Sequence, residues 1–322
     1  MTEPHSSFVD TDTIRLHYLE WDTSPLPTHS TTHTTSTSHN AHRIISPDIA
    51  PAIIDEIPIV LLHGLGATAD TWQLVARELC ARHRVVAFDS RGHGKSEKPD
   101  TSYDLVTLSE DIISAMAALG MGQVVLVAHG WGARVALVLA TRHPALVSHL
   151  ILLDCPHVEP RYWPGMTRER FLREQNPTED YASHDTFIEA RKREMNGFWS
   201  PEIEQILLHT IQELPDGSVS ERLGSAQQRL IRASLWEDRA LAYYSKLQCP
   251  VLLIPAAPEP GKELPEQLVH TDEFALAKGH MAQQVAAIIP HCSVLWMPDT
   301  AHDIQLQRPT MLAQAITQFI DA

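Results

Sequence analysis

The chain has 322 residues, 43% of them hydrophobic, which suits one large α/β domain or a core domain with a substantial insertion. Its formal net charge of -15 is spread through the sequence, and this argues against nucleic acid or an anionic membrane as partners. No run approaches the ~18 apolar residues of a membrane span, and the N-terminus lacks the pattern of a signal peptide. We therefore expect a cytoplasmic protein that acts on a small molecule; the sequence gives no oligomeric state.

The first stretch with strand character covers residues 14–21, and the composition changes abruptly after it. Residues 23–56 are rich in Thr, Ser and His and cannot bury a face, so we expect a mobile insertion there. Its four histidines lack a cysteine or carboxylate partner in a regular frame, and we expect no metal site and no cofactor. These histidines are His29, His33, His39 and His42.

From residue 57 onward, apolar strand patterns alternate regularly with helical ones. This alternation predicts a mainly parallel sheet covered by helices on both faces. The expected strands are residues 57–62, 84–88, 123–128 and 148–154, and the expected helices are 70–82, 107–120 and 132–143. In such a sheet, ligands bind beyond the carboxyl ends of the strands.

The alternation stops between residues 156 and 247, where charged helical stretches occur with no strand signal. We predict a helical cap at 156–247, inserted into a core of residues 1–155 and 248–322. Strands at 250–257 and 292–297 and a helix at 306–320 resume the core pattern. The cap carries most of the aromatic residues, which suits an apolar or aromatic substrate. These residues are Tyr162, Trp163, Phe171, Phe187, Phe198, Trp199, Trp236, Tyr243 and Tyr244.

The most informative segment is residues 124–137, an apolar strand followed by a tight turn and an apolar helix. This is the form of a nucleophile elbow, in which a Ser, Asp or Cys is held on a strained turn. Here Gly130 stands at the central position, and glycine has no side chain with which to attack a substrate. The pattern therefore predicts an elbow whose nucleophile position is vacant.

Four segments together resemble the α/β-hydrolase superfamily, and this resemblance implies an α/β-hydrolase fold. They are the "LLHGLG" loop at 61–66, the "FDSRGHGKSEKP" turn at 88–99, the "AHGWG" elbow at 128–132 and the "MPDTAHDIQLQRP" loop at 297–309. The order of the segments is that of the superfamily. The "HGWG" elbow is also similar to those of dehalogenases and epoxide hydrolases, whereas the "HGLG" loop is closer to lactonases and esterases.

The resemblance also implies the remaining site residues. His302 matches the catalytic histidine, Glu259 stands where the acid follows the next strand after the cap, and Asp154 is the rival acid. The implied oxyanion donors are the backbone N–H groups of Leu65 and Trp131. Two further histidines, His63 and His129, flank the expected pocket as orienting residues.

Two other nucleophiles lie near the elbow by motif, but neither fits its position. Ser96 matches a turn residue of the superfamily, and Cys155 follows a different strand. The four cysteines, Cys80, Cys155, Cys249 and Cys292, are widely spaced, and we expect reduced, buried thiols.

Three functions remain open from the sequence. The first is an enzyme in which His302 acts as a general base on a small apolar or aromatic ester or lactone, without a covalent intermediate at Gly130. A variant of it is proton abstraction from a hydroxylated aromatic, as in cofactor-free dioxygenases of this superfamily. The second is a ligand-binding pseudoenzyme, and the third is a disabled variant of a Ser or Asp hydrolase.

Overall fold

A computed structural model describes residues 3–22, 57–155, 159–163, 165–174, 180–195, 197–261 and 273–322. The predicted insertion at 23–56, with its four histidines, lies outside these residues. Within the described part, no group of histidine, cysteine and carboxylate side chains has the arrangement of a metal site. No helix there is long and apolar enough to cross a membrane.

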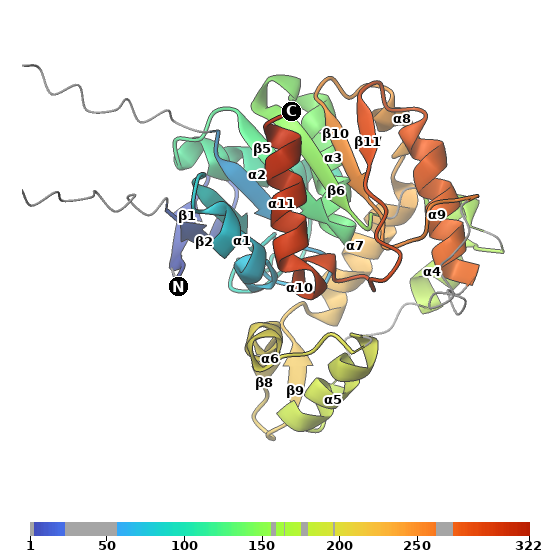
Figure 1. The fold of residues 1–322 in the computed structure, drawn as a ribbon. Coiled ribbons are helices and arrows are strands. Elements are labelled where there is room, and N and C mark those ends of the chain that lie inside the picture. Colours follow the sequence, from blue (N-terminus) through green and yellow to red (C-terminus); the bar gives the residue numbers. More distant parts are fainter. Residues whose placement is uncertain are drawn as a thin grey trace, which may run out of the picture.

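Eight strands form one sheet, in the order β1-β2-β4-β3-β5-β6-β10-β11 (Figure 1). β1 and β2 pair antiparallel at one edge, and β2 is antiparallel to β4, while the other pairs are parallel, as predicted. The strands are β1 His5–Asp10, β2 Arg15–Trp21, β3 Ile59–Leu62, β4 Val85–Phe88, β5 Val124–His129, β6 Val147–Leu153, β10 Val251–Ile254 and β11 Cys292–Val294. β1 was not predicted from the sequence.

Helices cover both faces of this sheet, because successive strand residues point to opposite sides. Val60 and Leu62 of β3 pack into one apolar cluster with α2 and α3, whereas Ile59 and Leu61 pack into another with α1 and α11. Figure 1 shows α11, in red, lying across the second face beside α1. The core helices are η1 Ala69–Trp72, α1 Gln73–Leu79, α2 Leu105–Ala118, α3 Gly130–Arg142, η2 Pro144–Leu146, α9 Glu273–Ala286, α10 Ile304–Gln307 and α11 Pro309–Ile320.

The segment between β6 and β10 is not purely helical, and this corrects the predicted all-helical cap. Three short strands form a separate antiparallel sheet in the order β7-β9-β8. The elements are η3 Pro160–Tyr162, α4 Arg168–Glu174, β7 Asp180–Tyr181, α5 His184–Glu194, α6 Pro201–Leu208, β8 Ile211–Glu213, β9 Val219–Glu221, α7 Ser225–Glu237 and α8 Leu241–Tyr244.

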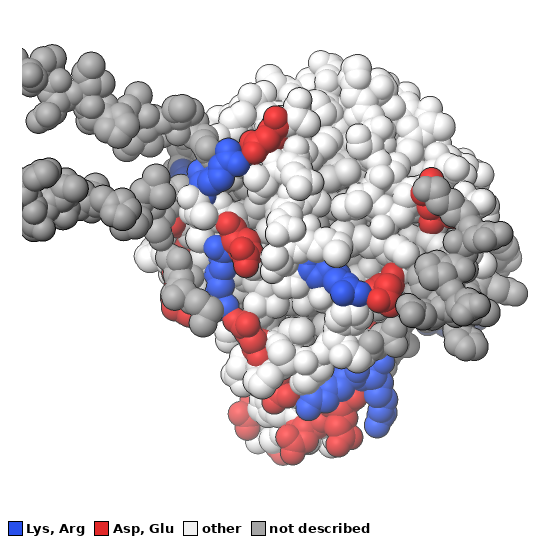
Figure 2. All heavy atoms as spheres, viewed as in Figure 1, with Lys and Arg blue, Asp and Glu red and all other residues white. Residues whose placement is uncertain are grey.

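Part of this segment projects from the core as a small lobe, made of α5, α6 and β7 to β9 (Figure 1). The lobe has its own apolar cluster, which includes Phe187, Ile206 and Val219 and takes in Leu306 from α10 of the core. Its surface carries acidic and basic side chains beside one another, in contrast to the mostly uncharged core surface in the same view (Figure 2). Ion pairs within the lobe, such as Lys192 with Glu204, account for part of this charge.

Candidate active site

A histidine and a carboxylate meet at the carboxyl end of the main sheet. His302 precedes α10, and its Nδ1 lies 2.7 Å from Oδ2 of Asp154, the residue that follows β6. The Asp154 side chain is 3% exposed, whereas that of His302 is 57% exposed and opens toward a cavity. Because the carboxylate accepts, Nδ1 carries the proton and Nε2 keeps a lone pair. The pair therefore has the geometry of an oriented general base.

Charge and hydrogen bonding set the protonation of this pair. Burial alone would raise the pKa of Asp154, but the His302 hydrogen bond and the charges of His302 and Lys278 hold it well below its usual range. Desolvation opposes protonation of His302, yet the hydrogen bond and charge of Asp154 outweigh it and raise the pKa of the ring. Asp154 is therefore ionised at neutral pH and stabilises the imidazolium form of His302.

The acid that contacts His302 is Asp154, and this corrects the expectation that Glu259 fills that place. The backbone N–H of Asp154 donates to Ile254 O at 2.9 Å, and that of Ala256 donates to Oδ1 of Asp154 at 3.1 Å. These bonds fix the carboxylate between the ends of β6 and β10. Glu259 lies five residues beyond the end of β10, whereas Asp154 directly follows β6.

Gly130 begins α3 directly after β5, on the turn that the sequence identifies as the elbow. Its φ of +54° is in the left-handed region, which a glycine adopts without steric cost. A Cβ at this position would lie 3.1 Å from Nε2 of His302 and 3.7 Å from the Cα of Gly64. The Nε2 edge of the imidazole ring therefore faces Gly130. The turn also needs Gly132, where a Cβ would lie 2.3 Å from the carbonyl oxygen of His63.

The two histidines beside the turn hold its loops in place. His129 Nε2 donates to the carbonyl oxygen of His302 at 2.9 Å, and the two rings lie 4.4 Å apart. Burial, with the nearby charge of His302, lowers the pKa of His129 to about 4, so this ring is neutral at physiological pH. His129 thus supports the loop that carries His302.

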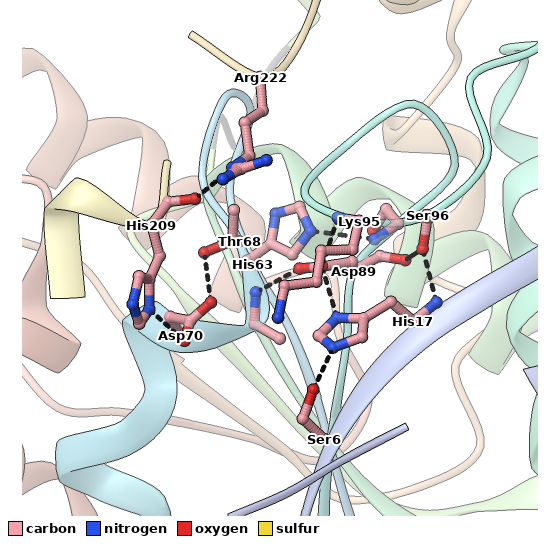
Figure 3. Close-up of polar contacts among 12 residues, drawn as sticks. Ser6, His17, His63, Thr68, Asp70, Asp89, Lys95, Ser96, His209 and Arg222 are labelled. Carbon is pink, nitrogen blue, oxygen red and sulfur yellow. Dashed lines mark hydrogen bonds and ion pairs between the residues drawn. The ribbon is translucent and has the colours of Figure 1, made fainter. Parts of the chain in front are cut away.

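His63 is fully buried, and its tautomer follows from its partners. The N–H of Ser90 donates to Nε2 at 3.0 Å, so Nδ1 carries the proton and donates to Gly64 O at 2.7 Å. Burial lowers its pKa, and the ring is a neutral connector between two loops. One of them is the 88–99 turn, whose Asp89 accepts from His17 Nδ1 at 2.7 Å and from the N–H of Ala69 at 2.7 Å (Figure 3).

Both expected oxyanion donors belong to segments that meet at Gly130: Trp131 follows it in the chain, and the Cα of Gly64, the residue before Leu65, lies 3.7 Å from the Gly130 Cβ position. Leu65 lines the cavity. Trp131 belongs to the first turn of α3, where backbone N–H groups have no partner within the helix. Its indole ring is buried and stacked on His93, with the ring centres 5.0 Å apart, so the side chain does not line the cavity.

A cavity of about 380 Å³ opens above His302 between the core and the lobe. Its lining is less aromatic than the content of residues 156–247 suggests, because Phe187 alone of the nine aromatic residues named there takes part. The lining residues are Gly64, Leu65, Gly66, Ala67, Thr71, His129, Phe187, Arg191, Glu194, Leu207, Thr210, Glu221, Ala301, His302 and Asp303.

Polar contacts join the lobe to the core at the rim of this cavity. His209 Nδ1 lies 2.6 Å from Oδ1 of Asp70 (Figure 3), and the same oxygen accepts from Gln73 Nε2 at 2.8 Å. On the other side, Nη2 of Arg191 lies 3.7 Å from Oδ2 of Asp303, the residue after His302. The sequence reading named none of these residues, since nothing in their local patterns distinguishes them from ordinary surface charges.

The two spare nucleophiles lie away from the cavity lining. Ser96 Oγ donates to Asp89 O at 2.6 Å as part of the 88–99 turn (Figure 3). Burial raises the pKa of the Cys155 thiol to about 12, so it stays protonated and unreactive. None of the four cysteines forms a disulfide, and Cys80, Cys155 and Cys249 are buried, as expected, whereas Cys292 is half-buried.

Comparisons with known proteins match most of the chain. The sequence model of the alpha/beta hydrolase family matches residues 59–315. The 2-(acetamidomethylene)succinate hydrolase of Mesorhizobium japonicum is 24% identical over 267 residues, which are 82% of this chain and 88% of that protein. The crystal structure of an E-2-(acetamidomethylene)succinate hydrolase superimposes with a TM-score of 0.70 and 20% identity, covering 99% of this chain and 100% of that one.

Other relatives match a shorter stretch at higher identity. The 1-acylglycerol-3-phosphate O-acyltransferase ABHD5 of Sus scrofa is 33% identical over 119 residues, 36% of this chain and 34% of that protein. Epoxide hydrolase 4 of Mus musculus is 37% identical over 101 residues, 31% of this chain and 28% of that protein. The match thus spans about a third of the length of these two relatives.

Proposed function

The chain belongs to the α/β hydrolase family, and from this premise we propose that it hydrolyses a small ester or lactone through His302 acting as a general base. Gly130 occupies the nucleophile position of the elbow, so the reaction passes through no covalent intermediate there. Asp154 is the acid of the pair. The backbone N–H groups of Leu65 and Trp131 bind the oxygen on which negative charge develops.

One observation carries this proposal: the position of His302 relative to Gly130. The ring is oriented by Asp154 through Nδ1, and its Nε2 faces the place where a side chain on Gly130 would begin, 3.1 Å away. A water molecule above Gly130 would be within reach of this base. The base is thus oriented toward a space in which water would take the place of a nucleophile.

The reaction proceeds in two proton transfers. Nε2 of His302 takes a proton from water while the water oxygen bonds to the substrate carbonyl carbon, and the carbonyl oxygen becomes negative between the two N–H donors. The tetrahedral carbon then expels the alcohol, which takes the proton back from His302 as the C–O bond breaks. Asp154 stays ionised throughout and stabilises the imidazolium.

The polar side chains in the cavity lining favour hydrolysis over proton abstraction from a hydroxylated aromatic. Thr71, Thr210 and Asp303 offer partners to water, whereas a dry apolar slot would suit the dioxygenase-like reaction. The apolar part of the substrate that the sequence predicts would pack against Leu65, Phe187 and Leu207. The substrate class therefore combines a small apolar group with a hydrolysable carbonyl.

The test is turnover on a panel of small esters and lactones by wild-type protein and His302→Gln, purified in parallel so that contaminating esterases cancel. We expect His302→Gln to lose at least about a hundredfold in kcat, the usual contribution of a general base. Intact mass spectrometry of quenched wild-type reactions should show no acylated protein.

Gly130→Ser is the matched variant, because its hydroxyl would face Nε2 of His302. It should accumulate an acylated form at residue 130 that the wild-type protein lacks. Equal turnover by wild type and His302→Gln would refute the proposal. Binding of panel compounds with no turnover in wild type would indicate a pseudoenzyme, and turnover in Gly130→Ser alone would indicate a disabled hydrolase.

A further inference from the structure

A lysine outside every sequence motif contacts the acid of the site. Lys278 lies on α9, and its Nζ is 3.0 Å from Oδ1 and 2.9 Å from Oδ2 of Asp154. Its side chain is 18% exposed, so the contact is largely shielded from solvent. The ammonium group therefore binds both oxygens of the carboxylate that orients His302.

Asp154 needs such support because its backbone is strained. Its φ of 35° is in the left-handed region, which among the described non-glycine residues only Ser102 shares. Such a conformation persists only where the surrounding contacts over-determine it. The N–H of Ala256 holds Oδ1 from the end of β10, and Lys278 holds both oxygens from α9.

The lysine also shares one oxygen of this carboxylate with His302. Oδ2 of Asp154 contacts both Nδ1 of His302 and Nζ of Lys278. A positive charge at this place makes protonation of the neighbouring ring less favourable, while Asp154 makes it more favourable. A general base must be unprotonated at its working pH, and the lysine acts in that direction.

The other charged groups around His302 lie on different elements. Asp303 follows it in the chain and favours protonation, and Arg191 of α5 lies 3.7 Å from that carboxylate. The neutral His129 ring packs at 4.4 Å. The charge of Lys278, which contacts the Asp154 carboxylate, opposes protonation of His302.

We propose that Lys278 is a positioning residue, which holds the Asp154 carboxylate in place and limits how strongly that carboxylate favours protonated His302. Its importance for turnover rests on the proposed function of His302, but its effect on the ring does not. The two can therefore be tested separately.

The experiment is an NMR titration of the His302 ring in the full-length protein, with the signal assigned by its loss in His302→Gln. Lys278→Met keeps the length of the stem and removes the charge, and Lys278→Arg is the control that keeps the charge. We expect the midpoint of His302 to rise by about one pH unit in Lys278→Met and to stay near the wild-type value in Lys278→Arg. Lys278→Gln replaces the methionine variant if the latter fails to fold.

An unchanged midpoint in a folded neutral variant would overturn the inference. The acidic limb of the pH–rate profile should move with the midpoint if His302 is also the base. A midpoint that moves in a protein without turnover would support the role of Lys278 and refute the proposed function.

Discussion

Gly130 and Asp154 both have positive φ, but for opposite reasons. At Gly130, with φ +54°, the absence of a side chain removes the steric cost of the turn and leaves space beneath Nε2 of His302. At Asp154, with φ 35°, the side chain makes this conformation strained, and hydrogen bonds to the carboxylate hold the residue in it. The backbone strain at this site therefore lies at Asp154, which contacts His302, and not at Gly130.

We expect Gly130→Ala to destabilise the protein. A non-glycine residue in the left-handed region costs about 1–2 kcal/mol, and the new Cβ would also press on His302. Gly120→Ala is the matched control, because Gly120 has φ +69° and nothing within 4 Å of its Cβ position. In urea denaturation the control should lose the backbone cost alone and Gly130→Ala somewhat more. A Gly130→Ala protein as stable as wild type would contradict this reading of the turn.

The sequence allowed most of the site to be predicted, because each segment carried its own local pattern. Gly130, His302 and the loop at Leu65 were predicted because each comes after a strand with a clear apolar pattern. The choice of Glu259 over Asp154 was wrong, and the sequence could not correct it, since both residues follow strands that end at the same edge of the sheet. The position of the Asp154 carboxylate depends on the pairing of β6 with β10, a contact between segments about 100 residues apart.

At the scale of elements, the missed features are those with the weakest local signal. β7 has two residues and β8 and β9 have three each, too few for an alternating pattern. Lys278 lies on α9, and its contact with Asp154 joins residues 124 positions apart in the sequence. No local periodicity predicts such a contact. The long core strands and helices were predicted because burial repeats along them.

The contact of His209 with Asp70 joins the end of α6 to η1 and should make this junction sensitive to pH. The hydrogen bond to Asp70 raises the pKa of His209 above its ordinary value of 6.5, and partial burial opposes this. Its stabilising effect is therefore fully present below pH 6.5, the unfolded value, and is lost as the pH rises through the folded value.

The measurement is hydrogen exchange of the backbone amides in α6 and β8. Their protection is compared between about pH 6 and about pH 9, after correction for the intrinsic exchange rate. Protection should fall at the higher pH in wild type. His209→Gln is the control, because its side chain does not titrate in this range, and its corrected protection should be flat. The same fall in both proteins would mean that another group is responsible.

At the scale of the whole molecule, the cap segment is held to the core by buried charge as well as by the contacts at the cavity rim. Arg134 of α3 and Asp238, which caps the end of α7, form an ion pair whose side chains are 1% and 4% exposed. The N–H of Arg239 also donates to the Asp238 carboxylate at 2.7 Å. α3 begins at Gly130, so this pair connects the cap to the helix that starts at the site.

Removing one partner of this pair should cost more than removing both. Arg134→Met leaves the Asp238 carboxylate buried without its cation, and breaking such a pair typically lowers the free energy of unfolding by about 3–5 kcal/mol. Burial already raises the pKa of Asp238, which Arg134 opposes, so the loss in Arg134→Met should shrink as the pH falls and the carboxyl is protonated. The double variant Arg134→Met, Asp238→Leu replaces the pair by apolar groups and should regain most of the stability. Guanidinium denaturation of wild type, Arg134→Met and the double variant measures the free energy of unfolding of each. A double variant less stable than Arg134→Met would show that the pair is not the link between cap and core.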